Sequence, residues 1–359
     1  MELVDDEFFR LQDESLACYP SYFKDIWESM FDKVISTTGG TILFGGAIGS
    51  RLYNLNEDNS DLDMFIVYQA PSDCFMSYEK HYVDALKNKD NHQPDYAIYE
   101  LGSFCQLLLQ RDTRAIELIY TASQYPLSDP TLIYYISSEF KLFIQQRILY
   151  LSPVLAKKYI SEFSGVKGMK KLHSQEKYYQ KLLKENNIND AELAKKRLYK
   201  GFYIMHRLLY QSRMILILFG FSPEIYKPNF EVFDSLVNIK VDEFTCYFNQ
   251  GTKERDIMLK IRKGELGLSY ENHIEFFEKE LIVLQNIIDS LKDDAFQNKK
   301  LNDFFEKTIR LMRIKSINDK LTSLDNNYSF NFDTIPLAKS PLKGLLIYYS
   351  LNYHYLTLK

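Results

Sequence analysis

Hydrophobic and polar positions follow two different periods along the chain of 359 residues. Between residues 40 and 120, short apolar runs alternate with amphipathic runs, a pattern typical of strands and helices in one compact unit. From Leu132 onward the helical period dominates, beginning with 134–149. The predicted strands are 41–44, 61–68 and 95–99, and a long amphipathic helix follows at 103–121. The pattern predicts an α+β fold, with a small mixed β-sheet and flanking helices followed by a helical domain.

The same change of period gives the expected domain boundaries. Residues 1–130 are expected to form the sheet domain together with N-terminal helices, residues 131–295 a helical domain, and residues 296–359 a C-terminal helical extension. With 46% hydrophobic residues, the chain can bury more than one core. We therefore expect more than one domain.

The stretch ILFGGAIGSRLYNL concentrates glycine at one place in the chain. We expect a turn from Gly45 to Ser50 and the first turns of a helix from Arg51 to Leu55. Backbone N–H groups exposed at Gly49 can bind an anion, and the Ser50 hydroxyl and the Arg51 guanidinium can add donors. The stretch lacks the Gly-Lys-Ser/Thr of a P-loop and the full glycine spacing of a dinucleotide-binding turn. It is a candidate phosphate-binding turn of another kind.

Two aspartates follow, in the sequence Asp61-Leu62-Asp63-Met64. On a strand, alternate side chains share a face, so both carboxylates point one way and both apolar side chains point the other way. Neighbouring carboxylates repel unless cations neutralise them, and their oxygens suit Mg²⁺ or Mn²⁺ that also binds substrate phosphates. Asp95 opens the next predicted strand and is placed to add a third ligand. The pattern predicts a metal site for phosphoryl transfer.

Together the turn and the aspartates resemble the signature of the DNA polymerase β superfamily of nucleotidyltransferases. The resemblance is closest to the RNA-ligase-associated branch, which carries a Gly-Ser-Arg-x-Tyr-Gly turn and Ser-Asp-x-Asp. The corresponding residues here are Gly49-Ser50-Arg51-Leu52-Tyr53-Asn54 and Ser60-Asp61-Leu62-Asp63. Asn54 stands where the branch has glycine, and asparagine is compatible with a left-handed turn position. Further similar segments at 95–120, 199–209 and 261–276 extend the resemblance over roughly residues 40–285.

The resemblance implies a nucleotidyltransferase domain in residues 1–130 and a substrate-binding role for residues 131–295. It implies that Asp61, Asp63 and Asp95 are catalytic residues that bind Mg²⁺ or Mn²⁺, and that a nucleoside triphosphate is the donor. The residues expected to bind the nucleotide are Gly49, Ser50, Arg51, Ser60, Lys200, His206 and Arg207. The expected reaction is transfer of a nucleoside monophosphate to an acceptor hydroxyl, with release of pyrophosphate.

The net charge of -4 hides a strong asymmetry along the chain. Residues 1–140 carry 9 Lys and Arg against 23 Asp and Glu, whereas residues 141–215 carry 16 against 5. The two segments could form a cleft with an acidic wall for metal and a basic wall for phosphates, or they could be an acidic front end and a solvated, lysine-rich helix pair. The basic segment and the family resemblance make an RNA end the expected acceptor.

Other interpretations remain open at this point. The acceptor could be a hydroxyl of a protein or a small molecule, or the chain could be an inactive member that binds nucleotide or RNA as a sensor. The four cysteines show no paired spacing that would indicate a zinc site or a disulfide framework. The acidic start and the lack of an apolar run of membrane-spanning length lead us to expect a cytoplasmic protein without a membrane partner. The oligomeric state is not predicted.

Overall fold

The computed structural model describes residues 22–57, 60–76, 85–87, 95–124, 134–165, 168–292 and 295–327. Contacts between residues divide the chain into two compact units, 1–312 and 313–359. Every element described below belongs to the first unit, except that helix α13 continues into the second. The domain boundaries expected near residues 130 and 295 therefore remain predictions. Of the expected C-terminal extension, residues 296–327 are described and the part after residue 327 lies outside the described residues.

The sheet has five strands in the order β3-β4-β2-β1-β5. The strands are β1 (Thr41–Ile48), β2 (Asp63–Gln69), β3 (Ala85–Lys87), β4 (Asp95–Glu100) and β5 (Tyr134–Ile136). β2 and β4 are parallel, and the other three neighbouring pairs are antiparallel, so the sheet is mixed. This confirms the predicted α+β class with a small mixed sheet.

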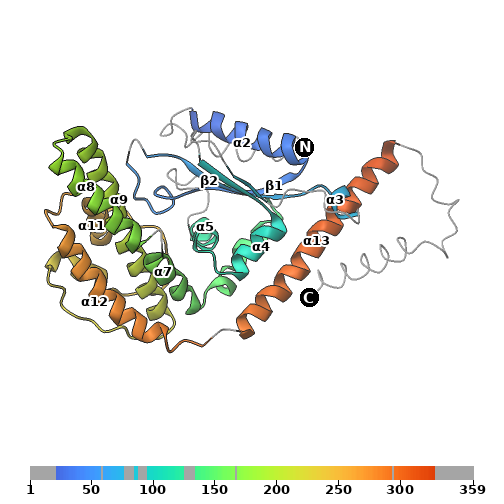
Figure 1. The fold of residues 1–359 in the computed structure, drawn as a ribbon. Helices are drawn as coiled ribbons and strands as arrows, with labels where there is room; N and C mark the ends of the chain where they lie inside the picture. Colours follow the sequence, from blue (N-terminus) through green and yellow to red (C-terminus); the bar gives the residue numbers. More distant parts are fainter. Residues whose placement is uncertain are drawn as a thin grey trace. The chain divides into compact units, whose positions relative to one another are not determined.

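Helices cover both faces of the sheet (Figure 1). α2 (Tyr22–Thr38) packs on one face, where Val34 contacts the core formed by Met64 and Ile66 of β2. α4 (Leu101–Leu109) and α5 (Thr113–Gln124) lie on the other face, where Phe65 and Val67 join the main core. Side chains alternate along a strand, so Asp63 shares the face of Phe65 and Val67 and lies on the side of α4 and α5.

Three local predictions differ from the structure. A turn was predicted from Gly45, but β1 continues through Gly45 and Gly46 to Ile48. The strand pairs with β2 on one side and β5 on the other, and these hydrogen bonds outweigh the low strand propensity of glycine. Residues 49–54 form hydrogen-bonded turns rather than the start of a helix. The edge strand β5 lies where the helical period predicted a helix from residue 134, and its pairing with β1 decides the conformation.

The rest of the first unit is helical, and several of its helices pack around one long helix. The remaining elements are α3 (Asp73–Met76), α6 (Lys141–Gln145), η2 (Arg147–Tyr150), α7 (Val154–Ser164), α8 (Met169–Lys184), α9 (Ile188–Leu218), η3 (Glu231–Phe233), α10 (Asp234–Val237), α11 (Lys253–Lys263), α12 (Tyr270–Ile288) and α13 (Ala295–Asn327). α9 contacts α7, α8, α11 and α12, and most of its residues after Phe202 are buried. A helix that is buried on nearly every side must be covered by other helices.

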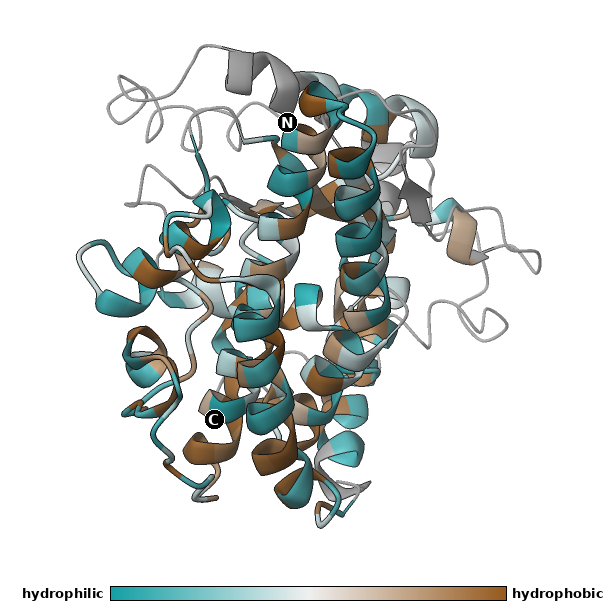
Figure 2. Ribbon diagram, turned by 60° about the vertical axis from the view of Figure 1, so that its left-hand side comes forward, coloured by the Kyte–Doolittle hydropathy of each residue, from teal (hydrophilic) through white to brown (hydrophobic). Residues whose placement is uncertain are grey.

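The hydropathy of the helices agrees with this arrangement. Figure 2 shows hydrophilic and hydrophobic residues side by side along the long helices, as expected where each helix buries one face and exposes the other. Within the described ranges, we find no helix with both the length and the apolar character needed to cross a membrane.

Two buried histidines lie between α9 and α12. The Nε2 atom of His206 is 2.9 Å from Nδ1 of His273, and the rings pack among aromatic side chains that include Phe233 and Phe277. Burial, with a smaller contribution from His273, lowers the pKa of His206 well below its usual value. Burial also lowers the pKa of His273 to about 4. The folded protein therefore holds both rings neutral near pH 6.

We predict that this pair makes stability depend on pH below neutrality. The unfolded chain takes up protons on histidine below pH about 6.5, whereas the folded state does not until lower pH, so the free energy of unfolding falls as pH drops from about 6.5 toward 4. Each histidine contributes a slope of about 1.4 kcal/mol per pH unit in that window. Urea unfolding of the wild type and of His206→Phe across this range measures the difference.

The expected result is that the wild type loses stability more steeply than His206→Phe below pH about 6, with parallel curves above pH about 7. Parallel curves over the whole range would contradict a neutral, buried His206.

Candidate active site

The turn after β1 is fixed by two residues with left-handed backbone. Gly49 has φ +70° and Asn54 has φ +56°. The N–H of Leu55 donates to the carbonyl of Ser50 at 2.9 Å, and the N–H of Asn54 donates to that of Arg51 at 3.1 Å. The left-handed position expected for Asn54 is confirmed. Because these residues form turns and not a helix, any anion bound at Gly49 and Ser50 meets individual N–H groups rather than a helix end.

Gly49 lies directly against the carboxylate of Asp63. A Cβ atom added at Gly49 would lie 2.6 Å from Oδ2 of Asp63. The absence of a side chain at Gly49 therefore leaves the space in which this carboxylate sits, beside the backbone of the turn. The turn and the aspartate form one small cradle.

The predicted acidic residues meet at one end of the sheet. Asp61 and Asp63 line the same pocket, and in the parallel pairing of β2 with β4 the Cα partner of Asp63 is Asp95. The side chain of Asp95 lies outside the described side chains. Among the described residues, no group of three or more His, Cys, Asp and Glu side chains is close enough to hold a metal ion. Asp61 and Asp63 supply hard oxygen donors, which are the chemistry that Mg²⁺ or Mn²⁺ requires.

Arginines hold the loop that carries Asp61 and leads into β2. Arg51 is 8% exposed, and its Nη2 donates to the carbonyl of Ser60 at 2.8 Å. Arg262 of α11 donates to the carbonyl of Leu55 and, at 3.1 Å, to Oγ of Ser60. It also pairs with Glu57 at 3.4 Å. Both arginines therefore position the loop between β1 and β2.

A buried carboxylate connects the turn with the helices. Glu117 of α5 is 1% exposed. Its carboxylate accepts hydrogen bonds from the hydroxyl of Tyr53 at 2.6 Å and from the hydroxyl of Tyr159 at 2.8 Å. It also accepts one from Nη1 of Arg207 at 3.1 Å. Burial raises the pKa of both tyrosines well above the usual value, so their hydroxyls remain proton donors. The Arg207 guanidinium also lies 4.0 Å from the centre of the Tyr53 ring.

These residues surround a pocket of about 510 Å³. On the sheet side, its lining includes Gly49, Ser50, Tyr53, Ser60, Asp61 and Asp63. On the helix side, its lining is Thr113, Arg114 and Glu117 of α5, Glu162 of α7, Lys200, Tyr203, Ile204 and Arg207 of α9, and Arg262 of α11. The volume lies within the range of about 300–1,000 Å³ usual for small-molecule sites.

The cations of this pocket differ in how far their charge is already neutralised. Arg114 pairs with Asp112, Arg207 with Glu117 and Arg262 with Glu57. Lys200 is exposed and forms no ion pair with any residue that the structure describes. Lys200 is therefore the lining cation best able to meet an anionic ligand.

Of the ten residues expected at the site, seven line this pocket, Arg51 and His206 do not, and the side chain of Asp95 is not among the described side chains. The pocket brings together Gly49, Ser50, Ser60, Asp61, Asp63, Lys200 and Arg207. The placement of Arg51 argues against the predicted nucleotide contact, because its side chain holds the loop carbonyls. The placement of His206 also argues against the predicted nucleotide contact. Consecutive residues on a helix point about 100° apart, so His206 is turned toward α12 while Arg207 faces the turn.

Glu117 and Arg262 also line the pocket, and neither is among the site residues predicted from the sequence. Glu117 interrupts the apolar run Ala115-Ile116-Glu117-Leu118-Ile119, and a charge inside such a run indicates a buried, paired group. This signal could have found Glu117. Arg262 acts across about two hundred residues of chain, and no local pattern reveals that contact.

The mixed sheet, the glycine–serine turn and the two aspartates at the start of β2 are the features expected of the DNA polymerase β superfamily of nucleotidyltransferases. Comparison with known families matches residues 24–216, more than half of the chain, to the RNA repair pathway DNA polymerase beta family. The chain belongs to this family, which confirms the resemblance seen in the sequence. A search of curated proteins found no match.

We predict that Gly49→Ala weakens metal binding more than it weakens the fold. The new Cβ must displace the Asp63 carboxylate, and the positive φ adds a backbone cost of about 1 kcal/mol. Gly251→Ala is the matched control, because Gly251 has φ +81° and no atom within 4 Å of the added Cβ. Titration with Mn²⁺ and urea unfolding measure the two effects.

The expected result is a similar loss of stability in both variants, with an affinity for Mn²⁺ lowered about tenfold or more only in Gly49→Ala. Equal Mn²⁺ affinities in the two variants would show that the cradle between Gly49 and Asp63 does not matter for the metal.

Proposed function

We propose that this protein is a metal-dependent nucleotidyltransferase that transfers a nucleoside monophosphate from a nucleoside triphosphate to a hydroxyl at an RNA end. The proposal is supported most directly by one observation: Ser50, Asp61, Asp63 and Lys200 all line the same pocket. Phosphoryl transfer requires little covalent participation by the protein, and depends on positioning and on stabilising charge. These side chains supply both.

In this proposal the triphosphate lies along the turn and toward α9. The backbone N–H groups and hydroxyl of Ser50 donate to phosphate oxygens, and Gly49 allows the close approach. Lys200 adds a positive charge from the opposite wall of the pocket. Arg207 contributes mainly through Glu117, which keeps the turn and α9 at a fixed separation.

The residues that would hold Mg²⁺ or Mn²⁺ are Asp61, Asp63 and Asp95. The cradle at Gly49 and the pairing of Asp63 with Asp95 support this set. The chemistry supplied by such a metal when bound is a lower pKa for the attacking hydroxyl and neutralisation of phosphate charge. Arg51 and Arg262 keep the loop bearing Asp61 in place.

The acceptor hydroxyl attacks the α-phosphorus, a new P–O bond forms, and the bond to the leaving pyrophosphate breaks in line with it. Asp95 accepts the hydroxyl proton in this proposal. Membership of the RNA repair pathway DNA polymerase beta family and the basic segment 141–215 favour an RNA end as the acceptor.

We predict that Asp61→Asn/Asp63→Asn abolishes transfer while leaving the fold intact, because the substitutions keep side-chain shape and remove the charges that hold the metal. Purified protein is incubated with Mg²⁺ or Mn²⁺, each α-labelled nucleoside triphosphate, and a mixture of RNA and protein. Label entering RNA should fall about a thousandfold or more, as expected when metal stabilisation worth several kcal/mol is lost. Asp242→Asn, at an exposed aspartate outside the pocket, is the control and should match the wild type.

The fraction that carries label identifies the acceptor. Label found in protein or in a small molecule, and not in RNA, would show that the acceptor is a protein or small-molecule hydroxyl instead of an RNA end. Absence of label from the wild type with all four nucleotides, while nucleotide still binds, would refute catalysis and favour a nucleotide sensor.

A further inference from the structure

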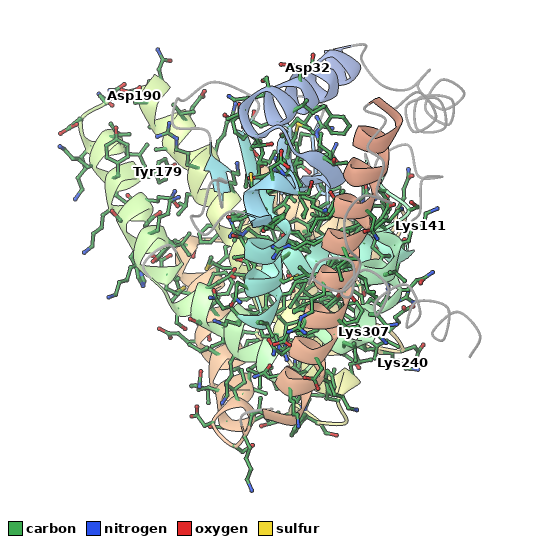
Figure 3. All side chains as sticks on the ribbon, turned by 90° about the vertical axis from the view of Figure 1, so that its right-hand side faces the viewer. Asp32, Lys141, Tyr179, Asp190, Lys240 and Lys307 are labelled. Carbon is green, nitrogen blue, oxygen red and sulfur yellow. The ribbon has the colours of Figure 1, made fainter. Side chains whose placement is uncertain are left out.

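A second pocket opens beside the first, between α8 and α9. Its volume is about 410 Å³. On the α8 side, its lining residues recur at the helical spacing i, i+3, i+4, i+7 from Gly168, the residue just before the helix, and its α9 residues recur at the same spacing from Arg197. Gly201 lets the helices approach closely, since a Cβ there would lie 2.7 Å from Cδ1 of Leu172. The two facing helix surfaces build this hollow together, and Tyr179 of α8 and Asp190 of α9 mark the helix pair in Figure 3.

The second pocket is basic. Lys171, Arg197 and Lys200 line it, and no acidic side chain is among its lining residues. Within the described part of the chain, none of these three charged groups forms an ion pair or a side-chain hydrogen bond. Three uncompensated cations around a concave surface attract an anion. The N-terminus of α8 at Met169 adds the positive end of a helix without a side-chain cap.

The floor of this pocket is apolar, and the pocket shares two lining residues with the first. Leu172, Ile204 and Met205 form part of the floor. Lys200 and Ile204 line both pockets. Consider a ligand that fills the second pocket and places its reacting end near Asp61 and Asp63. Such a ligand needs a phosphate to pair with the cations and a less polar sugar or base to contact the apolar floor.

We infer that the second pocket binds a phosphodiester and its nucleotide in a single-stranded RNA acceptor whose end reaches the first pocket. This inference rests on the proposed function for the identity of the reacting end. Single-stranded RNA fits because its phosphates repeat at regular intervals and its bases offer flat, apolar faces. The pocket thus gives the acceptor a site that adjoins that of the nucleoside triphosphate, with Lys200 lining both.

The test uses Lys171→Ala/Arg197→Ala in the full chain. Both residues line the second pocket and neither lines the first, whereas Lys200 lines both and is left intact. Lys177→Ala/Lys184→Ala is the matched control, since it removes two exposed charges of α8 outside the pocket. Fluorescence anisotropy with a short labelled single-stranded RNA is measured over a range of KCl concentrations, and nucleoside triphosphate affinity is measured separately.

The pocket variant should bind the RNA about tenfold more weakly than the control. Its plot of log affinity against log salt should be shallower by about 1.4, since each lost phosphate contact changes the slope by about 0.7 for single strands. Its affinity for nucleoside triphosphate should stay within about twofold of the wild type.

Equal RNA binding by the pocket variant and the control overturns the inference. A matching loss of nucleoside triphosphate affinity also overturns it, because the cations would then serve the triphosphate. Reduced labelling of a protein acceptor, with RNA binding unchanged, overturns it in favour of a protein. If RNA binding depends on the pocket but the wild type transfers no label, the RNA site stands and the proposed function fails.

Discussion

The carboxylate of Glu117 is buried and accepts hydrogen bonds from three other segments of the chain. Tyr53 comes from the turn after β1, Tyr159 from α7 and Arg207 from α9, while Glu117 itself belongs to α5. A buried charge that loses its partners costs several kcal/mol, so these four segments must stay together for the fold to persist. Their fixed separation sets the width of the pocket between the turn and α9. The geometry of the site thus depends on a residue that need not touch the substrate.

The charges around the pocket divide into those that hold the structure and those left for a ligand. Arg51, Arg207 and Arg262 are each engaged by carbonyl or carboxylate oxygens of the chain. Lys200 forms no ion pair in the described part of the chain, and it lines the same pocket as Asp61 and Asp63. Arginine suits the first task because its planar fork binds several fixed oxygens at once, and lysine suits the second because its compact charge moves with a ligand.

The sequence was most informative where local chemistry decides the structure. The alternation at residues 61–68 predicted β2 to within two residues, and Asn54 adopts the left-handed backbone that its place in the turn required. Predictions failed where distant contacts decide. The conformation at Gly45 depends on two neighbouring strands, and the conformation of Tyr134–Ile136 depends on pairing with β1. Glu117 shows an intermediate case, because its apolar neighbours indicate burial but not which residues it joins.

If the proposed function is correct, one pocket holds the metal between the two aspartates and the triphosphate between the turn and α9. Crystals grown with Mn²⁺ and a non-hydrolysable nucleoside triphosphate analogue test it directly, because anomalous scattering locates the metal. We expect an anomalous peak at Asp61 and Asp63, with the phosphates beside Ser50 and Lys200. A metal or triphosphate bound elsewhere, with this pocket empty, would contradict it.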